Sequence, residues 1–172
     1  MTHFRIKNQF RGTTSFDGIE LAHSDSIHRG SNPVRWVEMS LYLTESGIYV
    51  LDRVGMSLVY HKYDSDCDRG VRTAKNKLPE GAMPCYICRP ESERRGETWV
   101  SRAPFVDMEE ERHEVAECPT AEKILEALVT TRKKGAVGQP FLSLPAKRLL
   151  ELAAESDAGI ARVTQESERK IS

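Results

Sequence analysis

The segment from Arg35 to Leu43 is the feature that most restricts how this chain can fold. Apolar residues take every second position in it, and they alternate with Trp36, Glu38, Ser40 and Tyr42. Successive side chains of a β-strand point to opposite faces of a sheet, so a period of two is typical of a strand. The pattern therefore predicts a strand whose two faces differ in character.

Short connections follow this strand. Residues 44–47 read as a turn, residues 48–53 as a second strand, Val54 and Gly55 as a tight bend, and residues 57–61 as a third strand. A parallel return would need a crossover of a dozen or more residues. We therefore expect a three-stranded antiparallel meander over residues 35–61.

Weaker strand patterns flank the meander. They are predicted at residues 4–10, at 18–22, and as a hairpin of 97–106 with 111–118, while residues 24–33 read as a loop. The segment 111–118 also fits a helix capped by Asp107. We expect a strand there, because Pro119 and Thr120 already supply a fresh helix start and two helices would otherwise abut without a loop.

The last third of the chain predicts helices. The first covers about residues 120–134, with Arg132, Lys133 and Lys134 opposing the negative end of the helix dipole before Gly135. The second covers about 145–155, with Leu149, Leu150, Leu152 and Ala153 facing inward, and the third about 157–170. We expect an α+β fold in which a β domain (1–118) carries an irregular insert (about 62–97) and a helical segment (119–172) packs on it.

The chain has four cysteines, of which Cys67, Cys85 and Cys88 lie in the insert and Cys118 is the last residue of the β domain. Four thiolates can complete one tetrahedral zinc site, and a CxxC turn delivers two of them from one loop. The insert is rich in proline and polar residues, so it needs something other than an apolar core to hold it. The sequence predicts a structural zinc ion bound by the four cysteines, with His61 and His113 as alternate ligands.

Other readings of the cysteines stay open. The segment Cys85–Cys88 resembles the knuckles of zinc ribbons and treble clefs, which implies metal binding and nothing about a substrate. Cys67 and Cys118 also fit small buried side chains beside a coincidental CxxC. A redox dithiol is disfavoured, because Pro90 opposes the helix that would lower the pKa of Cys85.

Charge and hydropathy restrict the setting. The 25 basic and 26 acidic residues leave a formal net charge of -1, so no overall positive field recruits nucleic acid. Residues 1–7 lack the apolar run of a secretory signal, and apolar stretches such as 49–51 are too short to cross a bilayer. We expect a cytoplasmic protein that does not enter a membrane and whose thiols stay reduced.

Basic and aromatic residues around the meander suggest a partner surface. Aromatic rings on a sheet can stack on bases while basic side chains follow phosphates, and the candidates are Trp36, Tyr42, Arg35, Arg53, Lys62 and Arg72. Sheet aromatics are also common in cores, and scattered basic residues also serve solubility.

No catalytic motif accompanies these features. Neither His61 nor His113 has the partners of an HExxH site, and no His-x-Glu precedes Cys85. The sequence therefore predicts a non-enzymatic, zinc-stabilised adaptor or binding protein that engages a protein or a nucleic acid. The alternative is a small metal-dependent hydrolase or nuclease.

Overall fold

The computed structural model describes residues 1–9, 12–27, 35–62, 82–85, 106–108, 111–131 and 140–171. The chain forms two compact units. We call Met1–Ser26, Val37–Gly55 and Arg112–Ser172 the sheet–helix unit, and Ile27–Trp36 and Met56–Glu111 the small-sheet unit.

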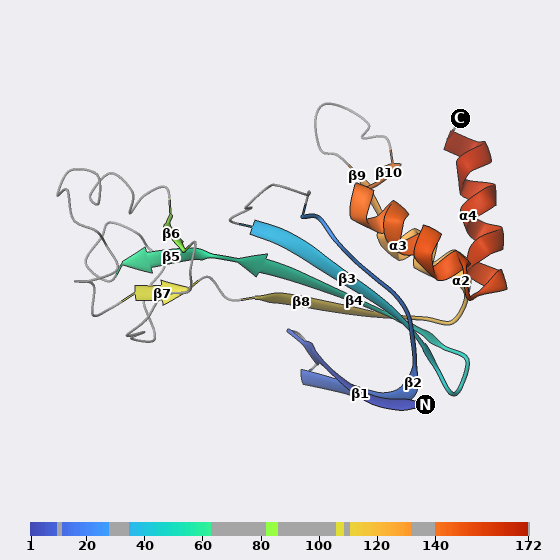
Figure 1. Cartoon of the computed structure of the whole chain (residues 1–172), viewed down its shortest axis with the longest axis horizontal. Helices are drawn as coiled ribbons and strands as arrows, with labels where there is room; N and C mark the ends of the chain where they lie inside the picture. Colours follow the sequence, from blue (N-terminus) through green and yellow to red (C-terminus); the bar gives the residue numbers. More distant parts are fainter. Residues whose placement is uncertain are drawn as a thin grey trace. The chain divides into compact units, whose positions relative to one another are not determined.

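A five-stranded antiparallel sheet, curved into a half-barrel, organises the sheet–helix unit (Figure 1). Its strands lie in the order β1-β2-β3-β4-β8. Their bounds are Thr2–Asn8, Gly12–Asp25, Arg35–Thr44, Tyr49–Ser57 and Arg112–Cys118. With the helices that follow, the sheet confirms the predicted α+β class.

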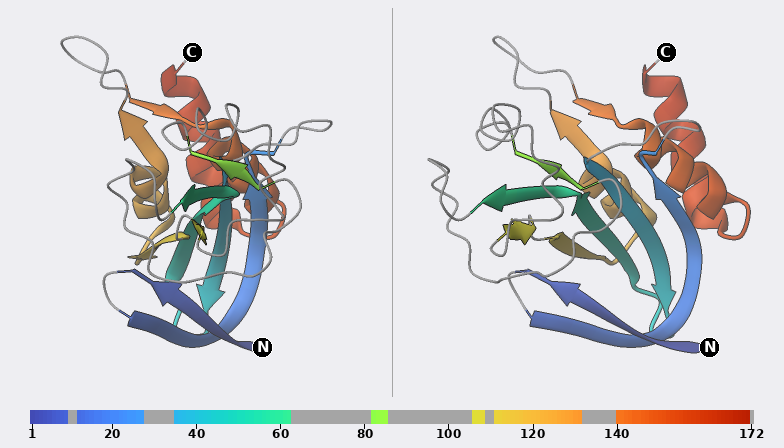
Figure 2. Two further views of the ribbon diagram at one scale, coloured as in Figure 1. Left: turned by 90° about the vertical axis from the view of Figure 1, so that its left-hand side faces the viewer. Right: turned by 60° about the vertical axis from the view of Figure 1, so that its left-hand side comes forward.

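The curvature comes from β2, which at 14 residues is more than twice as long as an average strand. Its first half pairs with β1 from Gly12 to Gly18, and its second half pairs with β3 from Gly18 to Asp25. A β-bulge at Leu21 interrupts the second pairing, and bulges bend a strand and increase its twist. Figure 2 shows the resulting arc of β2.

Three helices cover one face of this sheet. They are α2 (Ala121–Leu128), α3 (Leu144–Ala154) and α4 (Ala158–Ile171) (Figure 1). The sheet contributes Met39, Leu41, Leu51 and Cys118 to the shared core, and the helices contribute Ile124, Leu128, Leu149, Leu150, Ile160 and Val163. None of the helices in the described ranges is long and apolar enough to cross a membrane.

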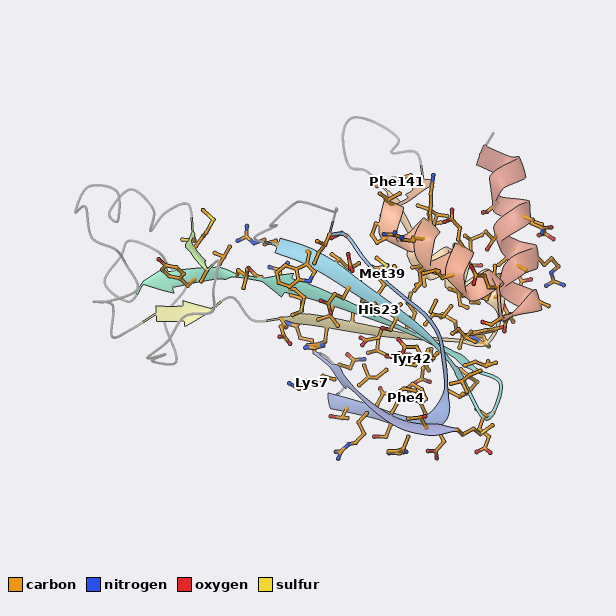
Figure 3. All side chains as sticks on the ribbon, in the orientation of Figure 1. Phe4, Lys7, His23, Met39, Tyr42 and Phe141 are labelled. Atoms are coloured by element: carbon orange, nitrogen blue, oxygen red, sulfur yellow. The ribbon has the colours of Figure 1, made fainter. Side chains whose placement is uncertain are left out.

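A second, smaller core lies on the opposite face, which we call the inner face. Ile6, Tyr42 and Val50 are buried in it. The ring of Phe4 packs on Tyr42 with ring centroids 4.7 Å apart (Figure 3). The ring of Phe16 packs on Tyr42 with ring centroids 5.6 Å apart. Strand β1 and the first half of β2 therefore close over the same sheet that carries the helices on its other side.

Side-chain caps start all three helices. Thr120 accepts from the Lys123 amide in α2, and Ser143 accepts from the Ala146 amide in α3. In α4, Asp157 Oδ1 accepts from the Ile160 amide at 2.9 Å, and both carboxylate oxygens of Asp157 accept from the Tyr49 hydroxyl at 3.0 Å. The Tyr49 hydroxyl thus links β4 to the first turn of α4.

Two short sheets complete the described structure. In the small-sheet unit, β5 (Val59–Lys62) lies between β6 (Met83–Pro84), to which it is parallel, and β7 (Val106–Met108), to which it is antiparallel. In the sheet–helix unit, β9 (Val129–Thr131) pairs with β10 (Pro140–Leu142).

The strand predictions need two corrections. β4 runs through Gly55 to Ser57 without the predicted bend. The third strand of the predicted meander corresponds to β5, which pairs with β6 and β7 and is not a neighbour of β4. Residues 111–118 do form a strand, β8, which pairs with β4 and has Tyr49 opposite Cys118; its predicted hairpin partner, residues 97–106, lies outside the described residues except for Val106.

The helix predictions need two corrections. The predicted helix 120–134 ends at Leu128, because the β-branched residues Val129, Thr130 and Thr131 form β9 instead. Arg132 to Lys134 lie outside the described residues and beyond the helix end, so a helix dipole does not explain them. Leu152 of α3, predicted to face inward, is 39% exposed.

We predict that Gly18→Ala destabilises the sheet–helix unit by about 2–3 kcal/mol. A Cβ at Gly18 would lie 2.4 Å from the backbone oxygen of Leu43, so β2 and β3 would have to separate. The matched control is Gly55→Ala in β4, where the nearest atom would be 3.5 Å away. Urea unfolding should show a change within about 0.5 kcal/mol for the control, and equal effects of the two variants would contradict the prediction.

We also predict that Tyr49→Phe costs about 1–2 kcal/mol, because a hydrogen bond to a charged group is lost. Asp157→Ala removes the same bond together with the cap of α4. A double-mutant cycle measured by urea unfolding should give a coupling energy of about 1 kcal/mol between the two residues. Strict additivity of the two variants would show that the contact contributes nothing.

Candidate functional site

The predicted zinc ligands are divided among three parts of the chain. Cys67 and Cys88 lie outside the described residues, as does the predicted partner residue Arg72. Cys85 belongs to the small-sheet unit and Cys118 to the sheet–helix unit. Both described cysteines are buried thiols, and neither forms a disulfide.

Cys118 is the last residue of β8 and belongs to the core between sheet and helices. It lies opposite Tyr49 in the sheet and is 3% exposed. Burial raises the pKa of its thiol, the charge of Glu126 adds to this, and that of Lys123 opposes it. The surroundings of Cys118 thus favour the neutral thiol over the thiolate that binds zinc.

Cys85 directly follows β6 and is 9% exposed. Its backbone N–H donates to the Tyr60 carbonyl at 2.9 Å, which extends the parallel pairing of β6 with β5 by one residue. Tyr60 is itself 2% exposed. The first cysteine of the CxxC pair is therefore anchored to a buried position of the small sheet.

The two alternate histidines occupy different sheets. His61 is in β5, in register with Asp107 of β7. His113 is in β8 on the inner face, opposite Val54, and its carbonyl accepts from the Gln9 amide at 3.2 Å. Within the described ranges, no three His, Cys, Asp or Glu residues gather closely enough to hold a metal ion.

The predicted partner residues are used in several ways. Tyr42 is 9% exposed because it packs in the inner core. The Arg53 guanidinium donates from Nη1 to Glu114 and from Nη2 to the Ala127 carbonyl, each at 3.2 Å, so it stabilises the end of α2. The other described candidates are Arg35, exposed at the start of β3, the half-buried Trp36, and Lys62 at the end of β5.

The sequence did not predict a row of polar residues on the inner face, formed by His23 of β2 and Ser40 of β3. His23 Nδ1 and Ser40 Oγ share a hydrogen bond of 2.9 Å between facing positions of β2 and β3. Burial raises the pKa of Tyr42, a hydrogen bond with Ser40 opposes the shift, and the charges of Glu20 and Asp52 add to it. The row is therefore continuous with the inner core through Tyr42.

Asp52 also lies on the inner face, on β4. Its Oδ1 is buried and has no hydrogen-bond partner in the part of the chain that the structure describes. Burial raises the pKa of the Asp52 carboxyl to about 6, and the nearby His113 opposes the shift. A carboxylate with an unpaired buried oxygen is costly, so folding favours the protonated acid.

Comparison with protein-family models, with curated proteins and with solved structures found no match. The chemistry of the described residues therefore carries the functional proposal.

We predict that Asp52→Asn stabilises the protein above pH 6. The folded pKa of about 6 exceeds the unfolded value of 3.8, so stability falls as the pH rises through this window and stays lower above it. The full difference between the two pKa values corresponds to about 3 kcal/mol of unfolding free energy. Because Asp52 is partly exposed, we expect a smaller gain for Asp52→Asn, of about 1–2 kcal/mol. The urea unfolding midpoints of the wild type and of Asp52→Asn, compared between pH 4 and pH 8, measure this gain.

Glu117→Gln is the control for this prediction, because Glu117 is an exposed carboxyl on the neighbouring strand β8. It should keep the wild-type pH profile. If Asp52→Asn also kept that profile, Asp52 would not be the group that titrates.

Proposed function

We propose that this chain is a non-enzymatic binding protein in which a structural zinc ion stabilises the small-sheet unit and a protein or nucleic acid is the partner. The observation that carries the proposal is the anchored position of Cys85. Its thiol is buried and its backbone is bonded to β5, so the CxxC segment begins at a defined place in the fold.

The small sheet gives a physical reason for the zinc ion. Its strands, as far as the structure describes them, contain four, two and three residues, fewer than the usual length of about 5–6. The described core of this unit consists of Val59, Tyr60 and Cys85. Zinc–thiolate bonds supply folding free energy where an apolar core is small.

The described polar contacts favour binding over catalysis. His23 and Ser40 form a cross-strand pair of the kind that stabilises sheets, and His23 is exposed. Arg53 is held by Glu114 and by the end of α2. Arg35 and Trp36, neighbours at the start of β3, are the residues of the described sheet that we propose for partner binding.

We predict about one zinc ion per chain in protein purified without added metal, measured by elemental analysis. Chelation should remove amide protection at residues 59–62 and at Met83 and Cys85, while the core strands at residues 39–42 and 49–52 stay protected in hydrogen exchange. Cys85→Ser should reproduce the effect of the chelator. Protein without zinc, or equal loss of protection in both units, would contradict the proposal.

The same preparations identify the partner class. Binding to short DNA or RNA that weakens steeply with salt, and that is lost in an Arg35→Ala, Trp36→Ala variant, would identify a nucleic-acid partner. Absence of such binding directs the search to proteins. Zinc-dependent cleavage of the DNA or RNA would refute the non-enzymatic assignment and favour a nuclease.

A further inference from the structure

We infer that the open edge of β8 binds an extended, basic segment of a partner protein, which pairs with Val115 and Glu117 as an added strand. The inference rests on the binding role of the proposed function. It favours a protein over a nucleic acid as the partner and places a contact surface on the sheet–helix unit. It involves neither the zinc ion nor Arg35 and Trp36.

The backbone groups of β8 have a defined orientation. β8 is the last strand in the order of the five-stranded sheet, with β4 on one side (Figure 1). On the other side, the Gln9 amide donates to the His113 carbonyl at 3.2 Å. In an antiparallel pair, residues whose N–H and C=O groups point at the partner strand alternate with residues whose groups point away. Since the His113 carbonyl points away from β4, the backbone groups of Val115 and Glu117 point away from it too.

The opposite edge of β4 confirms this alternation independently. The Thr44 amide donates to the Ile48 carbonyl at 2.8 Å, so the backbone groups of Ile48 point toward β3. Those of the next residue, Tyr49, then point toward β8, where Tyr49 lies opposite Cys118 in a register without a shift. Every second residue of β8, counted back from Cys118, therefore bonds to β4. The residues in between face the open edge, in agreement with the bond at the start of β8.

These outward-facing groups form a site for an added strand. In the part of the chain that the structure describes, no other strand pairs with this side of β8 beyond His113. Glu117 is exposed and Val115 is partly exposed. A row of unpaired N–H and C=O groups on a sheet edge is a template for an extended segment of another chain.

The side chains along the edge specify the chemistry of this segment. Residues of an added strand opposite Val115 and Glu117 are two positions apart and lie on one face. Val115 packs against the inner core, so an apolar residue fits opposite it. A basic residue fits opposite Glu117. The segment 111–118 carries three glutamates and one arginine, and this charge attracts a basic peptide and repels the phosphates of a nucleic acid.

A second copy of this chain fits the edge less well. Pairing β8 with the β8 of a copy would bring two acidic strands side by side, and like charges on facing strands are destabilising. Charged side chains on an edge strand are one of the ways in which proteins avoid such pairing. The occupant that fits is therefore a different chain with the opposite charge.

Amide hydrogen exchange of the full chain, with a soluble peptide of alternating valine and lysine as the probe, tests the inference. The peptide should protect the amides of Val115 and Glu117, which face the open edge. It should leave the amide of Ala116, which bonds to β4, unchanged. A peptide of alternating valine and glutamate is the charge control and should bind at least about 10-fold more weakly.

Variants at Glu117 separate charge from backbone pairing. Glu117→Lys should weaken binding of the valine–lysine peptide at least about 10-fold by charge repulsion. Glu117→Pro should weaken it about 5-fold or more, because proline removes an N–H that faces the edge and is not used by the β4 pairing. Glu45→Lys makes the same charge change at an exposed turn position and should bind like the wild type.

Three results would overturn the edge site and leave the proposed zinc-stabilised binding protein intact. They are absence of peptide binding, protection confined to other amides, and equal binding by Glu117→Lys and the wild type. Self-association of the wild type that is lost in Glu117→Pro would overturn the basic partner in favour of a second copy. A wild-type protein without zinc would instead refute the proposed function and leave the peptide result unchanged.

Discussion

The double pairing of β2 is the constraint on which the sheet–helix unit depends. One strand must serve β1 along its first half and β3 along its second, and Gly18 is the residue at which it has both as partners. A side chain there would collide with the backbone of Leu43. The bulge at Leu21 then directs Leu21 and Ala22, two successive residues, toward the helix-side core. Without these two local features the sheet could not curve and keep its apolar residues on the helix side.

The curvature creates two cores of unequal size, and this explains where polar groups gather. On the helix side, three helices supply enough apolar surface to cover the sheet. On the inner face, β1 and the start of β2 bring Phe4, Phe16 and Ile6 over Tyr42 and Val50. This small cluster does not extend over the whole face, and His23, Ser40, Asp52 and His113 are among the inner-face residues beside it. The cost of burying an unpaired Asp52 oxygen is a consequence of placing a polar strand position beside a partial core.

Local patterns were enough to predict some elements and not their partners. The period of two from Arg35 to Leu43 predicted β3, and Pro119 with Thr120 correctly favoured a strand over a helix for β8. The pairing of β8 with β4 joins residues about 60 positions apart, and no local signal records such a contact. For the same reason α2 was predicted too long, because the pairing of Val129–Thr131 with Pro140–Leu142 overrides the helical pattern. Asp52 was missed because one acidic residue in a strand carries no sign of its burial.

The cysteines, too, show that the sequence alone does not determine the surroundings of a residue. Four thiols in a sequence suggest one tetrahedral site, but a strand can place a thiol either in a ligand set or in a core. Cys118 is the last residue of β8. It pairs with Tyr49 of β4 across the sheet, and Thr120, which caps α2, follows two residues later in the chain. Cys85 follows a strand of two residues, and among the described residues of its unit the buried apolar ones are Val59, Tyr60 and Cys85 itself. Two thiols that the sequence makes equivalent therefore lie in different surroundings: loss of the Cys118 side chain would open a cavity in the main core, whereas Cys85 is buried beside two short strands of the small sheet.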